Sequence, residues 1–140
     1  MSLSIAAATD RLTQLLTDAN TASSTKVDVF VGEPAPKTDG DGKAHPYHAI
    51  FPSPGLRDAR DARLDGAHGA RLWRVQIKCA GGDVARALRA LERAQNVLVG
   101  ACLDDTTGLI REDGDGGPVR KDDTVSPARW FTDLLLSVEL

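Results

Sequence analysis

Residues 72–79 read Leu-Trp-Arg-Val-Gln-Ile-Lys-Cys, and residues 83–100 read Asp-Val-Ala-Arg-Ala-Leu-Arg-Ala-Leu-Glu-Arg-Ala-Gln-Asn-Val-Leu-Val-Gly. The first segment alternates between apolar and polar side chains, which is the pattern of a β-strand with one face toward water. Two glycines end it, and Asp83 is placed to cap a helix that begins near Val84. Gly100 stands where a helix commonly terminates in a left-handed residue. The rest of the chain can be placed around this strand and helix.

The predicted helix has an apolar face and a basic flank. Its apolar face is expected to pack on a sheet and comprises Val84, Ala87, Leu88, Leu91, Ala94, Gln95 and Leu98. Arg86, Arg89 and Arg93 follow each other at i, i+3 and i+7 and so share one flank. We expect this stripe to be solvated, and contact with an acidic partner surface is the alternative.

A first helix is predicted over residues 5–19, with Ser2 or Ser4 as its cap and a stripe of leucines on one side. Alternating patterns predict further strands at residues 27–31, 47–51, 108–112, 118–121 and 130–138. The first two of these strands are expected to form a hairpin with a long tip, and the third and fourth a second hairpin.

The order of elements predicts an α+β fold. Because the connections are mostly hairpin-like, we expect a mainly antiparallel (mixed) sheet of about five to six strands with two helices packed on one face. The 140 residues form a single domain, 1–140, by the usual relation between length and domain number. Two long loops are expected, at 34–46 and 56–70, and the second is expected to be an exposed, flexible excursion.

Composition gives no global electrostatic case for nucleic acid or an anionic membrane as a partner, although it excludes neither locally. The net charge is −3 and the pI is about 5.5, so we expect no specific nucleic-acid binding and no attraction to an anionic membrane. No window approaches eighteen apolar residues, so no membrane span is expected. Cys79 and Cys102 lack metal-ligand spacing and are expected to be buried free thiols.

Tests for chemistry give no active site and no cofactor site. Two Asp-Gly-Asp-Gly runs begin at Asp39 and Asp113, but the ligands that a calcium loop needs farther on are absent. His45 and His48 would lie on opposite faces of a strand, which disfavours zinc. Nucleophile-elbow, P-loop and dinucleotide motifs are also absent. The sequence therefore predicts a protein that is not an enzyme and carries no metal.

Several local strings resemble one family. They are residues 72–82, the following Ala/Leu/Arg-rich helix up to Gly100, and residues 108–112, 118–123 and 127–138. Together they resemble the tail terminator (tail completion) proteins of long-tailed phages that infect actinobacteria, and the resemblance spans nearly the full chain. It rests on framework and loop residues, not on catalytic signatures.

The resemblance implies a small structural virion protein that forms a ring, typically a hexamer, on the head-proximal end of the tail tube. Such a ring ends tube polymerisation and offers the docking surface for the head connector. Its partners would be copies of itself, the tail tube protein and head-tail connector proteins, first in the host cytoplasm and then in the virion. A head-tail connector or neck protein is one alternative, and a small-molecule-binding or hydrolytic α+β domain is another.

Two charged segments are candidate interfaces within such an assembly. Arg120-Lys121-Asp122-Asp123 sets two cations beside two anions, which can pair head-to-tail with the same segment of a neighbour. Within the loop 56–70, arginines alternate with aspartates from Arg57 to Asp65 without an apolar stripe, and we expect this segment to be disordered in the free subunit and ordered at a ring or tube interface. Its candidate contact residues are Arg57, Arg60 and Arg63.

Overall fold

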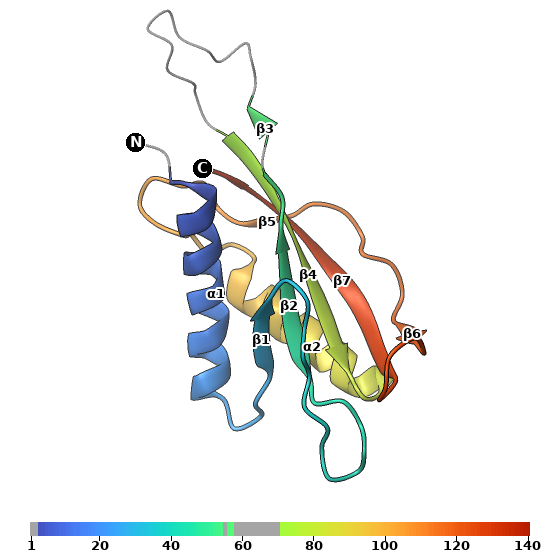
Figure 1. The fold of residues 1–140 in the computed structure, drawn as a ribbon. Helices are drawn as coiled ribbons and strands as arrows, with labels where there is room; N and C mark the ends of the chain where they lie inside the picture. Colours follow the sequence, from blue (N-terminus) through green and yellow to red (C-terminus); the bar gives the residue numbers. More distant parts are fainter. Residues whose placement is uncertain (1–2, 55, 58–70) are drawn as a thin grey trace, which may run out of the picture.

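The computed structural model describes residues 3–54, 56–57 and 71–140 (Figure 1). The elements in chain order are α1 (Ile5–Ala22), β1 (Asp28–Val31), β2 (Tyr47–Pro52), β3 (Leu56–Arg57), β4 (Arg71–Gly81), α2 (Val84–Leu98), β5 (Arg111–Glu112), β6 (Arg120–Asp122) and β7 (Arg129–Glu139).

The strands form one mixed sheet, and both helices pack on the same face of it. The order along the sheet is β1-β2-β4-β7-β5, while β3 pairs with β4 and β6 pairs with β7. The long strands β4 and β7 are antiparallel from the pair Leu72 and Glu139 to the pair Gly81 and Trp130. In Figure 1, α2 lies behind the sheet and α1 lies alongside β1. The predicted α+β class, with a mainly antiparallel sheet, is confirmed.

The main core lies between the sheet and the helices. In β4 and β7 the inward-facing residues alternate with more exposed ones, as the period-2 pattern predicts, whereas β2 is buried on both faces from Tyr47 to Ile50. The fully or nearly fully buried members include Trp73, Val75, Ile77 and Cys79 of β4 and Leu134, Leu136 and Val138 of β7. Leu12 and Leu16 of α1 and the small stripe Ala87, Ala90, Ala94 and Leu98 of α2 close this core from the other side.

Both helix starts follow from local chemistry. Ser4 Oγ accepts a hydrogen bond from Ala7 N at 3.1 Å, and a carboxylate oxygen of Asp83 accepts one from Arg86 N at 2.8 Å. Each bond satisfies an amide that has no partner within its helix. At the other end of α2, Gly100 has φ +86°, a conformation that glycine adopts without a steric penalty.

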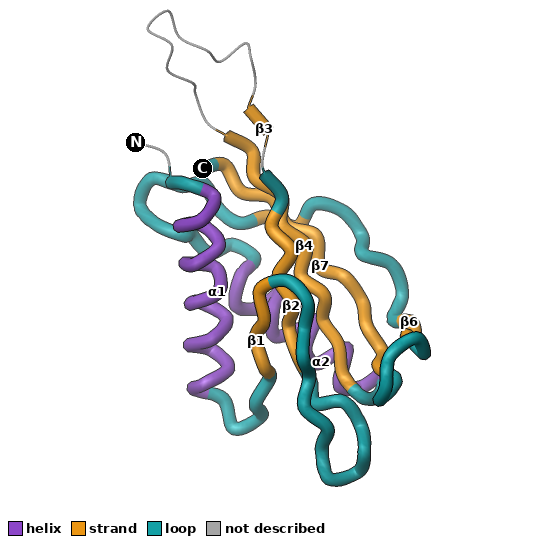
Figure 2. Tube along the Cα trace, in the orientation of Figure 1, coloured by secondary structure: helices purple, strands orange, loops and turns teal. Residues whose placement is uncertain are grey.

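The predicted hairpin between the first two strands is wrong, because β1 and β2 are parallel. Their register runs from Asp28 opposite Tyr47 to Val31 opposite Ile50. A parallel pair needs a connection that returns the chain to the end where it started, and residues 32–46 are long enough to do so. Figure 2 shows this connection crossing in front of β2, on the face opposite α2. An antiparallel bridge between Thr38 and Ala44 closes its tip.

The second predicted hairpin is also wrong. β5 and β6 do not pair with each other; both pair with β7, at Leu136–Ser137 and at residues 129–131 respectively. Because β4 occupies one edge of β7, β5 and β6 must share the other edge. The two short strands therefore pair with separate stretches of β7, over two residues for β5 and three for β6.

The buried face of α2 is rotated from the predicted one. Val84 and Leu88 were expected to face the sheet but remain 40% and 42% exposed, while Ala90 is fully buried. The small alanines let α2 lie close to the strands, which moves the bulkier residues of the predicted face to the flank of the helix. Leu91 on this flank is only partly buried.

Candidate functional site: a basic cavity beside the second helix

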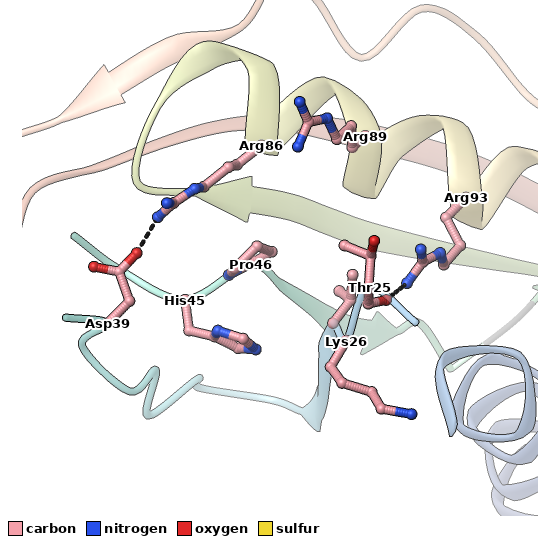
Figure 3. A pocket seen from close by; sticks show the side chains of 9 residues that line it. Thr25, Lys26, Asp39, His45, Pro46, Arg86, Arg89 and Arg93 are labelled. Carbon is pink, nitrogen blue, oxygen red and sulfur yellow. Dashed lines mark hydrogen bonds and ion pairs between the residues drawn. The ribbon is translucent and has the colours of Figure 1, made fainter. Parts of the chain in front are cut away.

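A cavity of about 220 Å³ lies between α2, the segment that leads into β1 and the connection before β2. Figure 3 shows its lining side chains, which come from three separate parts of the sequence: Thr25, Lys26 and Val27; Asp39, His45 and Pro46; and Arg86, Arg89 and Arg93. Four of them are cationic and only Asp39 is a carboxylate. The cavity is therefore strongly basic in a chain whose net charge is −3.

Arg86 is neutralised within the chain. Its guanidinium forms an ion pair with Asp39, both side chains being about a quarter exposed or less, at 25% and 22%. Asp39 also accepts hydrogen bonds from Asp41 N at 2.9 Å and Lys43 N at 3.0 Å. Partial burial works to raise the pKa of Asp39, but the Arg86 hydrogen bond and these amides outweigh it, and the pKa is lowered. This pair fastens the crossing connection to the start of α2.

Arg93 and Lys26 donate their hydrogen bonds to neutral acceptors and not to carboxylates. Arg93 donates to the Thr25 carbonyl, to Asn20 Oδ1 at 3.1 Å and to Ser23 Oγ at 2.9 Å. Lys26 Nζ donates to the Thr21 carbonyl at 2.6 Å. Neither side chain has a carboxylate partner among the described residues, so both contribute uncompensated positive charge to the cavity.

Arg89 is exposed, as Lys26 is, and it is the arginine of the stripe that the rest of the described chain leaves unbound. Among the described residues it makes no hydrogen bond or ion pair, and Figure 3 shows it between Arg86 and Arg93 on the same side of α2. The expectation that this arginine stripe is simply solvated therefore holds for Arg89 but is wrong for Arg86 and Arg93. Arg86 and Arg93 are bound within the subunit because the segments that precede β1 and β2 pack against α2.

A buried hydrogen-bond network connects the cavity to the core. His48 is fully buried on β2, and its Nε2 lies 2.7 Å from the Ala90 carbonyl of α2. Since a carbonyl can only accept, Nε2 carries the proton and Nδ1 accepts from Asn20 Nδ2 at 3.4 Å. Burial lowers the pKa of His48 to about 4. Asn20 in turn orients its Oδ1 toward Arg93.

The predicted interface segment 120–123 lies on β6 and just after it, at the β7 edge of the sheet. Arg120 pairs with Asp133 at 2.9 Å and covers the Phe131 ring, with its guanidinium carbon 4.6 Å from the ring centroid. Lys121 pairs with Asp123 at 3.3 Å, and both are well exposed. Asp122 accepts from Thr124 N and Oγ1. Arg120 thus has a role inside the subunit that the sequence did not reveal.

The other predicted contact residues fall at or beyond the limit of the described chain. Arg57 belongs to the two-residue strand β3, which pairs with β4 through Arg71. Arg60 and Arg63, and most of the predicted loop 56–70, lie outside the described residues.

The two cysteines differ. Cys79 is buried, as predicted, and burial together with the nearby Asp133 charge raises the pKa of its thiol. Cys102 was expected to be buried but is exposed. It lies at the turn after α2, where Leu103 takes the inward position.

Within the described ranges, no group of three or more His, Cys, Asp or Glu side chains is arranged to hold a metal ion. His45 lines the cavity while His48 points into the core, and His68 lies outside those ranges. In the same part of the chain, no helix is both long and apolar enough to cross a bilayer.

The sequence pointed to one wall of the cavity and missed the others. The i, i+3, i+7 arginine spacing marked the α2 flank, but nothing local indicates that Lys26, Asp39 and His45 face it. That grouping depends on the parallel pairing of β1 with β2, which places the starts of both strands at the same end of the sheet.

Comparison with known proteins gives likeness of fold without likeness of sequence. No family model matches the chain, and no curated protein matches it. A solved chain from the virion of a native gene transfer agent particle overlaps 94% of this chain and 96% of its own length, with a TM-score of 0.57 and 15% identity. A second solved chain overlaps 99% of this protein and 96% of itself, with a TM-score of 0.55 and 16% identity. The protein therefore shares, over nearly its whole described length, the fold of a gene transfer agent virion chain.

Proposed function

We propose that this protein is a structural component of a phage-like virion and has no enzymatic role. The observation that carries the proposal is the overlap with a gene transfer agent virion chain, which covers almost all of both chains. An overlap of this extent involves the whole fold and not a local motif. A surface with an uncompensated basic cavity suits a protein that binds other proteins, because unpaired charges at a surface are what a complementary partner neutralises.

Within the virion, the role we propose is that of a tail terminator. Copies of the chain form a closed ring, most simply a hexamer, on the head-proximal end of the tail tube, where the ring ends tube polymerisation and docks to the head connector. The tail-terminator resemblance of residues 72–82 and 118–123 supports this assignment. A closed ring needs a heterologous interface in which two different surfaces of one subunit meet. The proposed contact residues are Arg120, Lys121, Asp122, Asp123, Arg57, Arg60 and Arg63.

The experiment is native mass spectrometry of the purified chain, alone and with cognate tail tubes, followed by electron microscopy of the mixture. A tail terminator gives a closed ring at one end of each tube, and tubes polymerised in its presence stop at a defined length. Binding to isolated connector complexes but not to tubes would instead identify a neck protein. A monomer that binds neither would contradict a virion role.

A further inference from the structure

We propose that the basic cavity is one half of the contact between neighbouring subunits, and that it receives the acidic turn of the next copy, centred on Glu112 and Asp115. This inference rests on the proposed ring and assigns its surfaces. The cavity carries unpaired positive charge: Lys26, Arg89 and Arg93 have no carboxylate partner in the described chain, although the protein as a whole is acidic.

Glu112 and Asp115 are the carboxylates that we assign to this contact. Glu112 and Asp115 are exposed and belong to β5 and the turn after it. Glu112 accepts from the neutral amide of Gln95 at 2.8 Å, and Asp115 accepts from Gly117 N at 2.8 Å. Neither forms an ion pair with a described residue. Asp113 between them is already paired with Arg74 at 2.9 Å, so it is not part of the assigned contact.

The cavity and the acidic turn lie at opposite edges of the sheet. The cavity adjoins the segment that enters β1, which is one edge of the sheet, whereas β5 lies on the opposite edge. Figure 1 shows the turn after β5 on the far side of β7 from β1. Two complementary surfaces at opposite edges can meet only between different copies, in a head-to-tail contact that a rotation repeats. This is the type of interface that closes a ring.

Both surfaces lie in the helix layer, on opposite flanks of α2. The helical geometry places Arg86, Arg89 and Arg93 on one flank of α2 and Val84, Leu88, Leu91 and Gln95 on the other, roughly 160° apart. Glu112 contacts Gln95, so the acidic turn belongs to the helix layer, as the cavity does. Asp122 lies opposite Arg129 in the ladder and already accepts hydrogen bonds from Thr124, so it is not part of the assigned contact. Subunits that stay side by side in a ring therefore bring Glu112 and Asp115 to the cavity.

The apolar surroundings of the two halves also match. Val27 and Pro46 line the cavity, and Leu91 lines the hollow that holds Glu112 and Asp115. Carboxylates that enter the cavity lie against these apolar groups, and their removal from water strengthens the ion pairs.

The test compares two charge reversals that change net charge equally. Arg89→Glu places the new negative charge in the cavity, whereas Arg111→Glu places it next to Glu112 in the acidic turn. Both arginine side chains are exposed. We expect Arg89→Glu to lower the fraction of subunits in rings by at least about tenfold at fixed concentration, and Arg111→Glu to leave it unchanged or raise it. Native mass spectrometry and electron microscopy on tail tubes give the fraction, and circular dichroism follows the fold.

A charge exchange identifies the occupant. Glu112→Lys alone should also disrupt rings, and Arg89→Glu combined with Glu112→Lys should restore a substantial part of the loss, since both residues belong to the same chain. Rings that persist in Arg89→Glu, or that the double variant does not restore, overturn this assignment while leaving the proposed function intact. Rings that persist while tube binding is lost would assign the cavity to the tube protein instead. A wild-type chain that never forms rings contradicts the proposed function itself.

Discussion

Asn20 Nδ2 donates to Nδ1 of the buried His48 across 3.4 Å, and this contact joins α1 to the middle of the sheet. The same asparagine accepts from Arg93 through its other amide atom. A core interaction between α1 and β2 is thereby linked to the orientation of a cation in the surface cavity. The consequence is that the basic cavity is held in place by the core, not only by loop residues.

Replacement of Asn20 should therefore destabilise the fold. Asn20→Ala leaves His48 Nδ1 buried without a donor, and we expect the free energy of unfolding to fall by about 1–3 kcal/mol. Asn96→Ala is the matched control, because Asn96 is an exposed helical asparagine without a bond to any described residue; its effect should stay within about 0.5 kcal/mol. Denaturant unfolding measures both. Equal effects in the two variants would show that the Asn20 contact contributes nothing.

His48 should make stability depend on pH. Its pKa is about 4 in the fold and about 6.5 in the unfolded chain, so the unfolded state binds the proton first as the pH falls. Stability is then retained above about pH 6.5 and lost progressively toward pH 4. Between pH 7 and 4.5, the wild type should lose roughly 2–3 kcal/mol more than His48→Gln, which cannot titrate in this range. Parallel unfolding curves at both pH values for the two proteins would be inconsistent with a neutral buried His48.

Gly116 should tolerate no side chain. A Cβ at this position would lie 1.6 Å from the Asp133 carbonyl oxygen, which is fixed in the backbone of β7. Gly116→Ala must displace the acidic turn from β7, and we expect a loss of about 1–3 kcal/mol. Gly40→Ala is the control, since a Cβ there meets no atom within 4 Å. If thermal unfolding of Gly116→Ala coincides with that of the control, the turn is not held against the strand as described.

Reversal of the aspartates after β6 should affect assembly more than folding. Asp123 is 74% exposed in its side chain and, among the described residues, pairs only with the half-exposed Lys121, so Asp123→Lys has little to disrupt in that part of the subunit. Asp122→Lys additionally removes the bonds from Thr124. If this segment lies in a ring interface, the double reversal should reduce ring occupancy on tubes, scored by electron microscopy. Normal occupancy would remove these residues from the interface.

The compensating change for that reversal has to avoid Arg120. Arg120→Glu would place a carboxylate next to Asp133 and remove the cation–π contact with the Phe131 ring. It should therefore lower the thermal unfolding temperature, whatever its effect on assembly. Lys121→Glu meets no such obstacle, because the ion-pair partner of Lys121 in the described part of the chain is Asp123, which is already changed. Recovery of rings by Lys121→Glu, with an unchanged unfolding temperature, would support pairing across copies.

The sequence alone predicted the elements whose causes are local. Alternation over residues 72–79 and 130–138 set two strands and their inward faces, because side chains on a strand point to opposite sides at each step. Asp83 and Gly100 marked the ends of α2, since capping and left-handed termination depend on one residue and its immediate neighbours. The fold class followed from the order of these elements.

Tertiary structure decided what the local pattern leaves open. Whether β1 lies parallel or antiparallel to β2 depends on where residues 32–46 run, and turn residues within a long connection do not specify its path. The same pairing brings Lys26, Asp39 and His45 to the arginine flank of α2, and it converts Arg86 and Arg93 from solvated charges into bound ones. Likewise, β5 and β6 pair with separate stretches of β7 and not with each other, a placement that no residue near either segment specifies. Charges far apart in the sequence thus become one cavity for a physical reason: their positions are set by strand pairing across the sheet, not by the residues beside them.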